Sequence, residues 1–266
     1  MYAFNYHRPK STDEASKLVT EAEDGKLIAG GMTLLPSMKL RLAAPSDLVD
    51  LAAVDGLKGI TVSGKTVTIG AMIRHVDVHT SAEVKKAIPG LAALAGGIGD
   101  PSVRNRGTMG GSVANADPAA DYPSAVLGLN ATVETTRRKI AADDFFTGLF
   151  ETALEPGEII KAIHFPIPDA AAYEKFPQPA SGFAMVGAFV ARFGKDVRVA
   201  ITGAKDHVFR VPEMEKALAA KFSGDAIADI KIPEDDMMSD IHCSADYRAH
   251  LVTVIAKRAA AKAAAG

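Results

Sequence analysis

The sequence predicts an α+β protein with a small C-terminal domain. A brief apolar run enters a glycine pair near residue 30 and leads into a short helix. Residues 60–69 alternate β-branched and other residues around a two-residue turn, as a β-hairpin does. Beyond a proline-rich segment at 167–180, strand patterns are followed by helix patterns. Together these features favour mixed sheets and helices.

The first elements run from a surface helix to the hairpin. Residues 12–24 predict a short surface helix, and Lys26–Ala29 predict a buried strand that ends in a tight loop at Gly30 and Gly31. Pro36 then lies where the first turn of a helix tolerates proline. We expect strand, glycine loop and short helix in that order.

The middle of the chain contains one unusual stretch. We expect a helix over 83–95 and strands over 126–134 and 158–166. Residues 99–123 are rich in Gly, Pro, Asp and Asn and are too long for a simple connection. This stretch is therefore predicted to be a functional loop.

The C-terminal part begins with a predicted domain junction near 167–180, where prolines are frequent. Strands are expected near 183–193 and 197–203, and helices near 211–221 and 245–264. Ser244 is the expected N-cap of the last helix. One face of this helix is predicted to carry Tyr247, Leu251, Val254 and Ile255.

Composition excludes several classes of protein. With 48% hydrophobic and 23% charged residues, the 266-residue chain resembles an ordinary globular protein. The net charge of -2 and the lack of a long basic block argue against a nucleic-acid partner. No run of 18 apolar residues occurs, and Met1–Pro9 lacks a signal-peptide pattern, so we expect a cytoplasmic protein without a transmembrane segment.

Cysteine usage restricts the redox chemistry. Cys243 is the only cysteine, which rules out an intrachain disulfide. One thiolate cannot hold an ordinary four-cysteine iron–sulfur cluster. Any such cluster is therefore expected on another polypeptide.

Two segments pair adjacent glycines with hydroxyl residues: Ala29–Thr33 and Arg106–Ser112. Such segments let backbone N–H groups approach phosphate oxygens, and two of them could hold a diphosphate. Glycine pairs are also common in ordinary turns. Neither segment matches a Rossmann or Walker A motif. The adjacent Arg104 and Arg106 could balance phosphate charge, and they could equally lie at a subunit surface.

A longer run identifies a family. Residues 99–123 closely resemble the second FAD loop of molybdenum-hydroxylase flavoproteins, and residues 29–33 resemble the first FAD loop. The resemblance continues through 173–176, 179–184 and 240–248, so it covers nearly the whole chain. This family includes the medium subunits of carbon monoxide dehydrogenases and the flavin domain of xanthine dehydrogenase.

The resemblance implies a specific domain organisation. Residues 1–170 are expected to form the two-part FAD-binding fold shared with vanillyl-alcohol oxidase, split near 55–60. Residues 171–266 are expected to form the family's small C-terminal α+β domain.

The resemblance also implies the cofactor-binding residues. The diphosphate and ribityl chain are expected to run between two sets: Ala29, Gly30, Gly31 and Thr33 on one side, and Thr108, Gly110, Gly111 and Ser112 on the other. Asp121 matches an acidic residue at the flavin end of the cofactor. Ile160 matches an apolar residue near the isoalloxazine, and Phe183 matches a residue that covers the ring.

Met32 departs from the family pattern, in which many members have His or Gln at this position. A thioether cannot form the histidyl link found in some relatives of this fold, so non-covalent FAD is expected. Binding is expected to depend mainly on the surrounding backbone.

The implied function is electron transfer. Substrate would be oxidised at a molybdenum cofactor on a large subunit, and electrons would pass through two [2Fe–2S] clusters on a small subunit to FAD on this chain and then to NAD or another acceptor. A dimer of heterotrimers is expected, and no protein residue is expected to be catalytic. The alternatives are a stand-alone FAD-dependent oxidoreductase of the same fold and a scaffold that has lost FAD.

Other candidate residues have competing structural roles. His75 and His79 are four residues apart, as metal ligands on a helix can be, but no third ligand has suitable spacing and no metal is expected. Asp117 and Asp121 could form an acid/base pair, although nearby prolines also favour loop-forming and helix-capping roles. For Asp117 the structural role is favoured.

Overall fold

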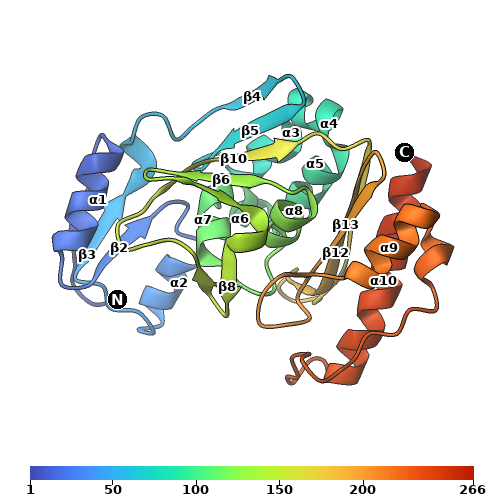
Figure 1. The fold of residues 1–266 in the computed structure, drawn as a ribbon. Helices are drawn as coiled ribbons and strands as arrows, with labels where there is room; N and C mark the ends of the chain where they lie inside the picture. Colours follow the sequence, from blue (N-terminus) through green and yellow to red (C-terminus); the bar gives the residue numbers. More distant parts are fainter.

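The computed structural model, which describes residues 1–266, contains three β-sheets and a two-stranded hairpin, and the hairpin is inserted between two strands of the second sheet (Figure 1). Helices pack between and beside these sheets. The architecture confirms the predicted α+β class.

The first sheet is parallel and has the strand order β1-β3-β2. Its strands are β1 (Asn5–His7), β2 (Gly25–Ile28) and β3 (Asp47–Asp50), connected by α1 (Thr12–Glu21) and α2 (Leu34–Lys39) and followed by η1 (Leu51–Ala53). Ser11 caps α1 by accepting a hydrogen bond from the Glu14 backbone N–H. Parallel strands place their carboxyl ends at one edge of a sheet. The segment after β2, residues 29–33, therefore lies at that edge.

The second sheet is antiparallel, in the order β4-β5-β10-β6-β7. Along β10, Ile163 and Phe165 are fully buried, whereas His164 between them bonds to Thr68 and Glu134. This alternation gives the sheet one apolar face and one polar face. The strands are β4 (Ile60–Ser63), β5 (Thr66–Gly70), β6 (Thr132–Thr135), β7 (Lys139–Ala141) and β10 (Ile160–Pro166).

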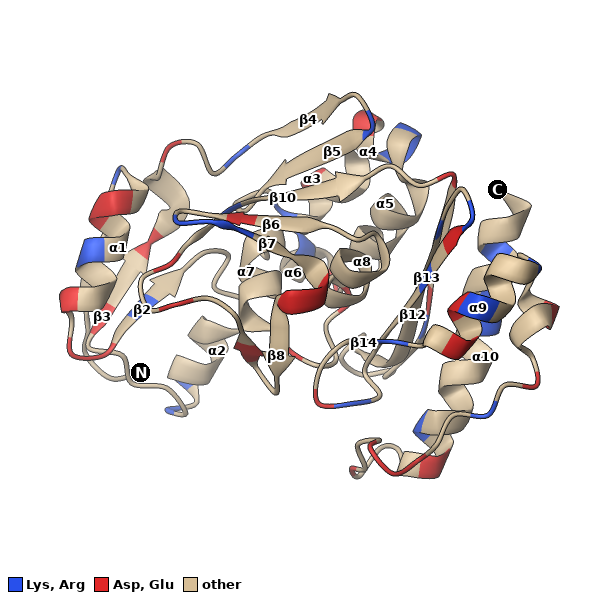
Figure 2. Cartoon of the chain, viewed as in Figure 1, with Lys and Arg blue, Asp and Glu red and all other residues tan.

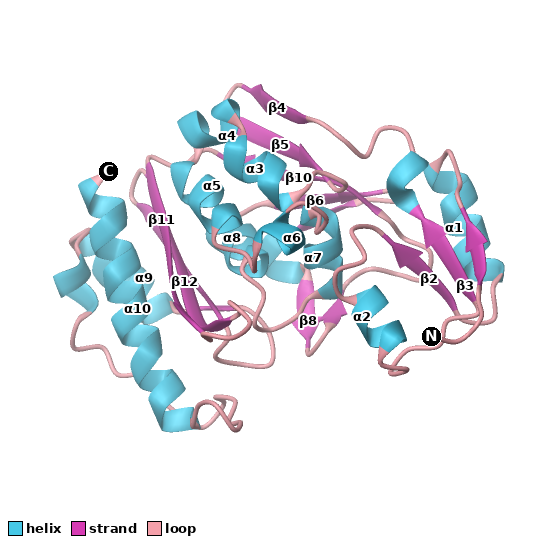
Figure 3. Ribbon diagram, turned by 180° about the vertical axis from the view of Figure 1, so that it is seen from behind, coloured by secondary structure: helices cyan, strands magenta, loops and turns pink.

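Short helices cover the apolar face of this sheet (Figure 3). They are α3 (His75–Thr80), α4 (Ala82–Ala87), α5 (Pro89–Gly96), α6 (Pro101–Arg104), α7 (Met109–Asn115) and α8 (Tyr122–Gly128). All of them except α6, which contacts α3, contribute residues to the core there. The turn η2 (Ala142–Asp144) leads to the hairpin of β8 (Phe146–Gly148) and β9 (Glu151–Thr152).

The third sheet is also antiparallel and is covered on both faces. Helices α9 and α10 pack on one face, and α5 and α8 pack on the other. Its central strand β12 is consequently buried from Ala184 to Ala191, which explains its continuous apolar sequence. The elements are β11 (Ala170–Pro177), β12 (Ala184–Phe193), β13 (Asp196–Thr202), β14 (Phe209–Arg210), α9 (Pro212–Ala220), η3 (Gly224–Ile227) and α10 (Ala245–Ala265).

Several sequence-based boundaries were wrong. The helix expected over 83–95 is two helices, α4 and α5, because Pro89 cannot continue α4 and begins α5 instead. The expected functional loop at 99–123 is largely a series of short helices. Of the strand expected over 126–134, residues 126–128 instead end helix α8, since a short apolar run does not distinguish helix from strand and Pro123 favours a helix start, whereas residues 132–134 do belong to β6.

The predicted face of the last helix also needs correction. Ser244 is the N-cap residue as expected, but Tyr247 is 42% exposed. Arg248 is buried in its place, because its guanidinium donates hydrogen bonds to the carbonyl oxygens of Met185 (2.7 Å) and Gly203 (2.5 Å). It also pairs with Asp240 at 2.7 Å. These partners make burial of a charged side chain tolerable.

Charges of both signs are distributed along the chain, and α1 and α9 each carry both (Figure 2). None of the helices has the combination of length and apolar composition needed to cross a membrane.

We predict that Arg248→Met destabilises the protein by about 2 to 4 kcal/mol, because two buried carbonyls and Asp240 lose a charged donor. The free energy of unfolding from urea titration measures this effect. Arg258→Met is the matched control, since Arg258 is an exposed arginine on the same helix. Equal stability of the two variants would contradict the anchoring role of Arg248.

Candidate functional site

The two glycine segments contact each other in the structure. A methyl group on Gly30 would lie 2.7 Å from the Cα of Gly107 and would overlap the carbonyl oxygen of Arg106. A methyl group on Gly111 would lie 3.4 Å from the Cβ of Ala29. The end of β2 and the start of α7 therefore lie side by side, as Figure 1 shows. The fold brings together the two segments that the sequence singled out.

The first segment presents unused hydrogen-bond donors. None of the five backbone N–H groups of residues 29–33 donates to an acceptor in the protein. These residues are half-buried or exposed, so the donors are accessible. Gly31 has φ +72°, a conformation that favours glycine. Successive free N–H groups in such a turn form an anion-binding concavity.

The second segment uses most of its donors within the protein. The N–H groups of Met109 and Gly110 donate to the carbonyls of Ile73 (2.9 Å) and Ala71 (2.8 Å). The N–H of Gly111 donates to the Thr108 hydroxyl at 3.1 Å, so Thr108 caps α7. A methyl group on Gly110 would meet the Ala71 Cβ at 2.5 Å. The segment is thus a wall fixed against residues 71–73.

The two segments therefore differ although their sequences are alike. Residues 29–33 offer donors to a ligand, whereas residues 108–111 are held in place by internal bonds. Ser112 and Thr33 add hydroxyl groups that make no hydrogen bond of their own within the protein and are partly or fully exposed. This combination suits an extended anionic ligand such as a diphosphate.

His75 and His79 lie in different surroundings, and the ring of His75 makes no hydrogen bond through Nδ1. His75 is buried beside Gly107, and its backbone N–H donates to the Gly107 carbonyl at 3.0 Å. Burial, aided by the charge of Arg104, lowers the pKa of His75 to about 4. His79 shares a 2.9 Å hydrogen bond with the Ala92 carbonyl through Nδ1. The structure contains no group of three or more His, Cys, Asp or Glu side chains placed to hold a metal ion.

Of the other charged candidates near the loops, Arg104 and Asp117 shape the loop backbone and Arg106 is exposed. The Arg104 guanidinium donates to the carbonyls of Ile98 (2.9 Å) and Gly99 (2.8 Å), so it shapes the loop. Arg106 is exposed. Asp117 accepts a 2.9 Å hydrogen bond from the Ala119 N–H, which is the expected loop-forming role.

Asp121 lies in a buried polar cluster. Its Oδ1 accepts a hydrogen bond from the Tyr173 hydroxyl at 2.5 Å and lies 3.0 Å from the Lys175 Nζ. Burial raises the pKa of Asp121, although the charge of Lys175 and the Tyr173 hydrogen bond act in the opposite direction. Sequence reasoning assigned no role to Tyr173 or Lys175. Their spacing of two on a strand, which places both side chains on one face, was the available signal.

The two apolar site candidates occupy different environments. Ile160 is 4% exposed and lies in the largest hydrophobic core, at a β-bulge where β10 pairs with β6. Phe183 is 46% exposed and ends the turn between β11 and β12. The structure thus places one in the protein core and the other at the surface.

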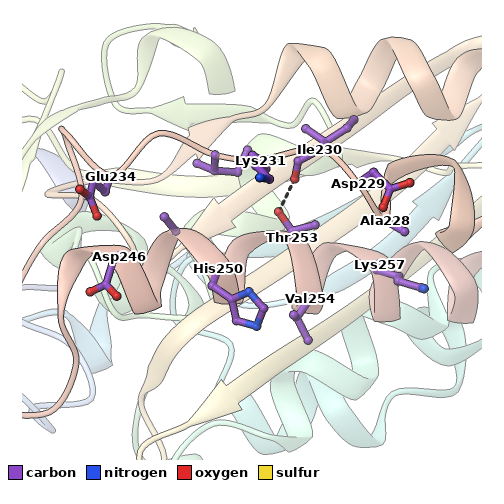
Figure 4. Close-up of a pocket in the computed structure, with 12 residues that line it drawn as sticks. Ala228, Asp229, Ile230, Lys231, Glu234, Asp246, His250, Thr253, Val254 and Lys257 are labelled. Carbon is purple, nitrogen blue, oxygen red and sulfur yellow. Dashed lines mark hydrogen bonds between the residues drawn. The ribbon is translucent and has the colours of Figure 1, made fainter.

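A separate pocket lies in the C-terminal part, with a volume of about 680 Å³ (Figure 4). It is lined by α10 and residues 228–234, and the Thr253 hydroxyl donates to the Ile230 carbonyl at 2.7 Å. None of its lining residues belongs to the glycine segments.

Known proteins similar to this chain include FAD-binding proteins, which fits a site suited to a diphosphate. A family model described as the FAD binding domain in molybdopterin dehydrogenase matches residues 2–168. The chain is 36% identical to the nicotine 6-hydroxylase medium subunit of Paenarthrobacter nicotinovorans over 99% of this chain and 98% of that protein. It is also 36% identical to the carbon monoxide dehydrogenase medium chain of Hydrogenophaga pseudoflava, over 96% and 95% of the two chains.

Solved structures give the same result. A chain of carbon monoxide dehydrogenase from Hydrogenophaga pseudoflava matches with a TM-score of 0.88 at 35% identity, covering 99% of this chain and 98% of that chain. A chain of quinoline 2-oxidoreductase from Pseudomonas putida 86 matches with a TM-score of 0.85 at 31% identity, covering 100% and 98%. The expected fold is confirmed. The chain belongs to the family of FAD-binding medium subunits of molybdopterin dehydrogenases.

Proposed function

We propose that this chain carries electrons from [2Fe–2S] clusters on a small partner subunit, through its FAD, to NAD or another acceptor. The five free N–H groups of residues 29–33, held against the second glycine segment, are the observation that carries the cofactor assignment. FAD supplies the redox chemistry, because it accepts electrons singly and releases them as a pair. The role of the chain is to bind the cofactor and to orient and shield its ring.

The proposed residue roles are those that the family resemblance implies, and the free N–H groups of the first segment support the part that concerns the diphosphate. The free N–H groups of Ala29, Gly30, Gly31, Met32 and Thr33 would bind the diphosphate, and the wall of Thr108, Gly110, Gly111 and Ser112 would face it. Asp121 would act at the flavin end, Ile160 would support the ring from the core, and Phe183 would cover it. The surface position of Phe183 suits a side chain that packs on a bound ring.

The proposal includes partner subunits for the remaining redox centres. Cys243, buried and free, is the only cysteine, so iron–sulfur clusters require another chain. A large molybdenum-cofactor subunit and a small iron–sulfur subunit would complete the enzyme as a dimer of heterotrimers in the cytoplasm. The relatives are named the medium subunit of nicotine 6-hydroxylase and the medium chain of carbon monoxide dehydrogenase, which supports a multi-subunit enzyme with further subunits.

We also propose that residues 1–170 form the FAD-binding domain and residues 171–266 the C-terminal domain. The family model ends at residue 168, between β10 and β11, which belong to different sheets. A division of the first domain near 55–60 is supported by the change from the first sheet to the second, between η1 and β4.

Non-covalent attachment of FAD gives the first prediction for this function. Met32 has a thioether at the position where a histidine could form a covalent link, so acid precipitation should release FAD into the supernatant. The absorbance and mass of the released flavin are measured. Flavin that stays with the protein pellet, or released FMN in place of FAD, would contradict the assignment.

The electron-transfer role predicts how activity depends on the partner subunits. After its FAD has been reduced chemically with dithionite, the isolated chain should pass electrons to an artificial acceptor, but it should not hydroxylate substrate, because it lacks the upstream centres. Hydroxylation should begin only when the molybdenum and iron–sulfur subunits are added. Reoxidation of the reduced complex by NAD and by other acceptors, followed by flavin absorbance, identifies the acceptor. Hydroxylation by the isolated chain would support a stand-alone oxidoreductase and overturn the proposal.

The contact between the glycine segments predicts that Gly30→Ala lowers FAD affinity by at least about tenfold, because the new methyl group would push the segments apart. Equilibrium binding of FAD and circular dichroism are measured together. The control is Gly148→Ala, where the nearest atom is the flexible end of Glu151 at 3.1 Å. Normal FAD affinity of Gly30→Ala would show that the segments do not hold the cofactor as proposed.

A further inference from the structure

Lys175 connects three separate segments of the chain. Its Nζ donates to the carbonyl oxygens of Gly97 at 2.9 Å and Gly182 at 2.7 Å, and it lies 3.0 Å from Asp121 Oδ1. The side chain is 12% exposed. A lysine ammonium has three N–H donors, and three acceptors surround this one. The ammonium is therefore saturated and held in one position.

The turn that Lys175 contacts has no other hydrogen bond to the rest of the protein. Within residues 178–183, the N–H of Gln178 donates to the Phe183 carbonyl at 2.8 Å, and the Gln178 side chain accepts from the Ser181 N–H at 2.9 Å. The remaining hydrogen bonds of the turn are also internal, apart from the one from Lys175 to Gly182. Lys175 is therefore the only hydrogen-bonded link of the turn to its surroundings.

The turn lies directly against the start of the long loop that leads to the second glycine segment. A methyl group on Gly182 would lie 3.5 Å from the Cα of Gly99, and Gly182 has φ +74°. Phe183 follows immediately and is partly exposed. Lys175 thus holds Phe183 near both Gly97 and Asp121, which precede and follow the second glycine segment in the chain.

We propose that Lys175 is a positioning residue that fastens the 178–183 turn, and Phe183 with it, over the flavin end of the FAD site. This inference rests on the proposed role of Phe183 in covering the flavin ring. Asp121 balances the charge of the largely buried ammonium, and Tyr173 fixes the carboxylate by donating to the same oxygen. Without Lys175, the turn keeps its internal bonds but loses its attachment to Gly97 and Asp121.

The test uses the full chain with FAD bound and the substitution Lys175→Met. Chymotrypsin cleavage after Phe183 reports detachment of the turn, and cleavage after Phe150, 54% exposed at the tip of the β8–β9 hairpin, is the internal reference. Cleavage after Phe183 and the rate of FAD release, measured by flavin fluorescence, should each rise about tenfold, as expected for loss of one charge-assisted hydrogen bond. Cleavage after Phe150 should not change.

Two further variants keep the test decisive. Lys175→Met leaves the Asp121 carboxylate buried without its counterion, which could itself destabilise the protein. The double variant Lys175→Met with Asp121→Asn removes both charges, and its turn should still detach. Lys262→Met is the matched control. Lys262 on α10 donates at 2.6 Å to Glu174, the neighbour of Lys175 on β11, but does not contact the turn. This control should match the wild-type chain in cleavage and in FAD release.

Three results would overturn the proposal. Unchanged cleavage after Phe183 in both Lys175 variants would show that the lysine does not fasten the turn. An equal rise after Phe183 and Phe150 would indicate general destabilisation. Faster cleavage after Phe183 with unchanged FAD release would show that the turn does not help to hold the cofactor. A wild-type chain that binds no FAD would instead refute the proposed function, and the cleavage comparison would still test the link to the turn.

Discussion

The close approach of Gly30 to Arg106 and Gly107 is the constraint on which the site depends. Only a hydrogen atom fits between the two backbones at this point, so the parallel N-terminal sheet and the helices beside the second sheet meet through main-chain contact. Residues 71–75 after β5 hold the second segment in place by accepting from Met109 and Gly110 and donating to Gly107. A ligand at this junction therefore meets a backbone that is already ordered, which lowers the entropic cost of binding.

The two glycine segments that meet at this junction have similar compositions but different roles. Residues 29–33 follow a parallel strand and leave five N–H groups free, whereas residues 108–111 use their N–H groups to attach to the neighbouring chain. Ligand binding by backbone donors tolerates side-chain variation, because the donors do not depend on residue type. A substitution of one side chain in this loop, such as that of Met32, therefore leaves the N–H donors in place.

The C-terminal sheet is joined to the cofactor-binding part by a shared core. Strand β12 is buried on both faces, and Phe189 packs so closely against α8 that a methyl group on Gly128 would lie 3.0 Å from its ring. Polar contacts follow the same interface, where Asp121 from one part meets Tyr173 and Lys175 from the other. The sheet thereby carries the turn with Phe183 to the edge of the proposed flavin site.

Contiguous patterns in the sequence determined the α+β class, the hairpin at 60–69 and both glycine segments, because periodicity and glycine spacing are local properties. The family followed from the resemblance of residues 29–33 and 99–123 to known FAD loops, which is also a property of contiguous residues. Local patterns did not distinguish helix from strand at 126–128, where the packing of α8 against β12 and β13 decides. Nor did they reveal buried Arg248 or Lys175, because a charged side chain can be buried only where distant residues supply acceptors. The different tasks of the two glycine segments likewise depend on which N–H groups find partners elsewhere, and only the tertiary structure brings those partners together.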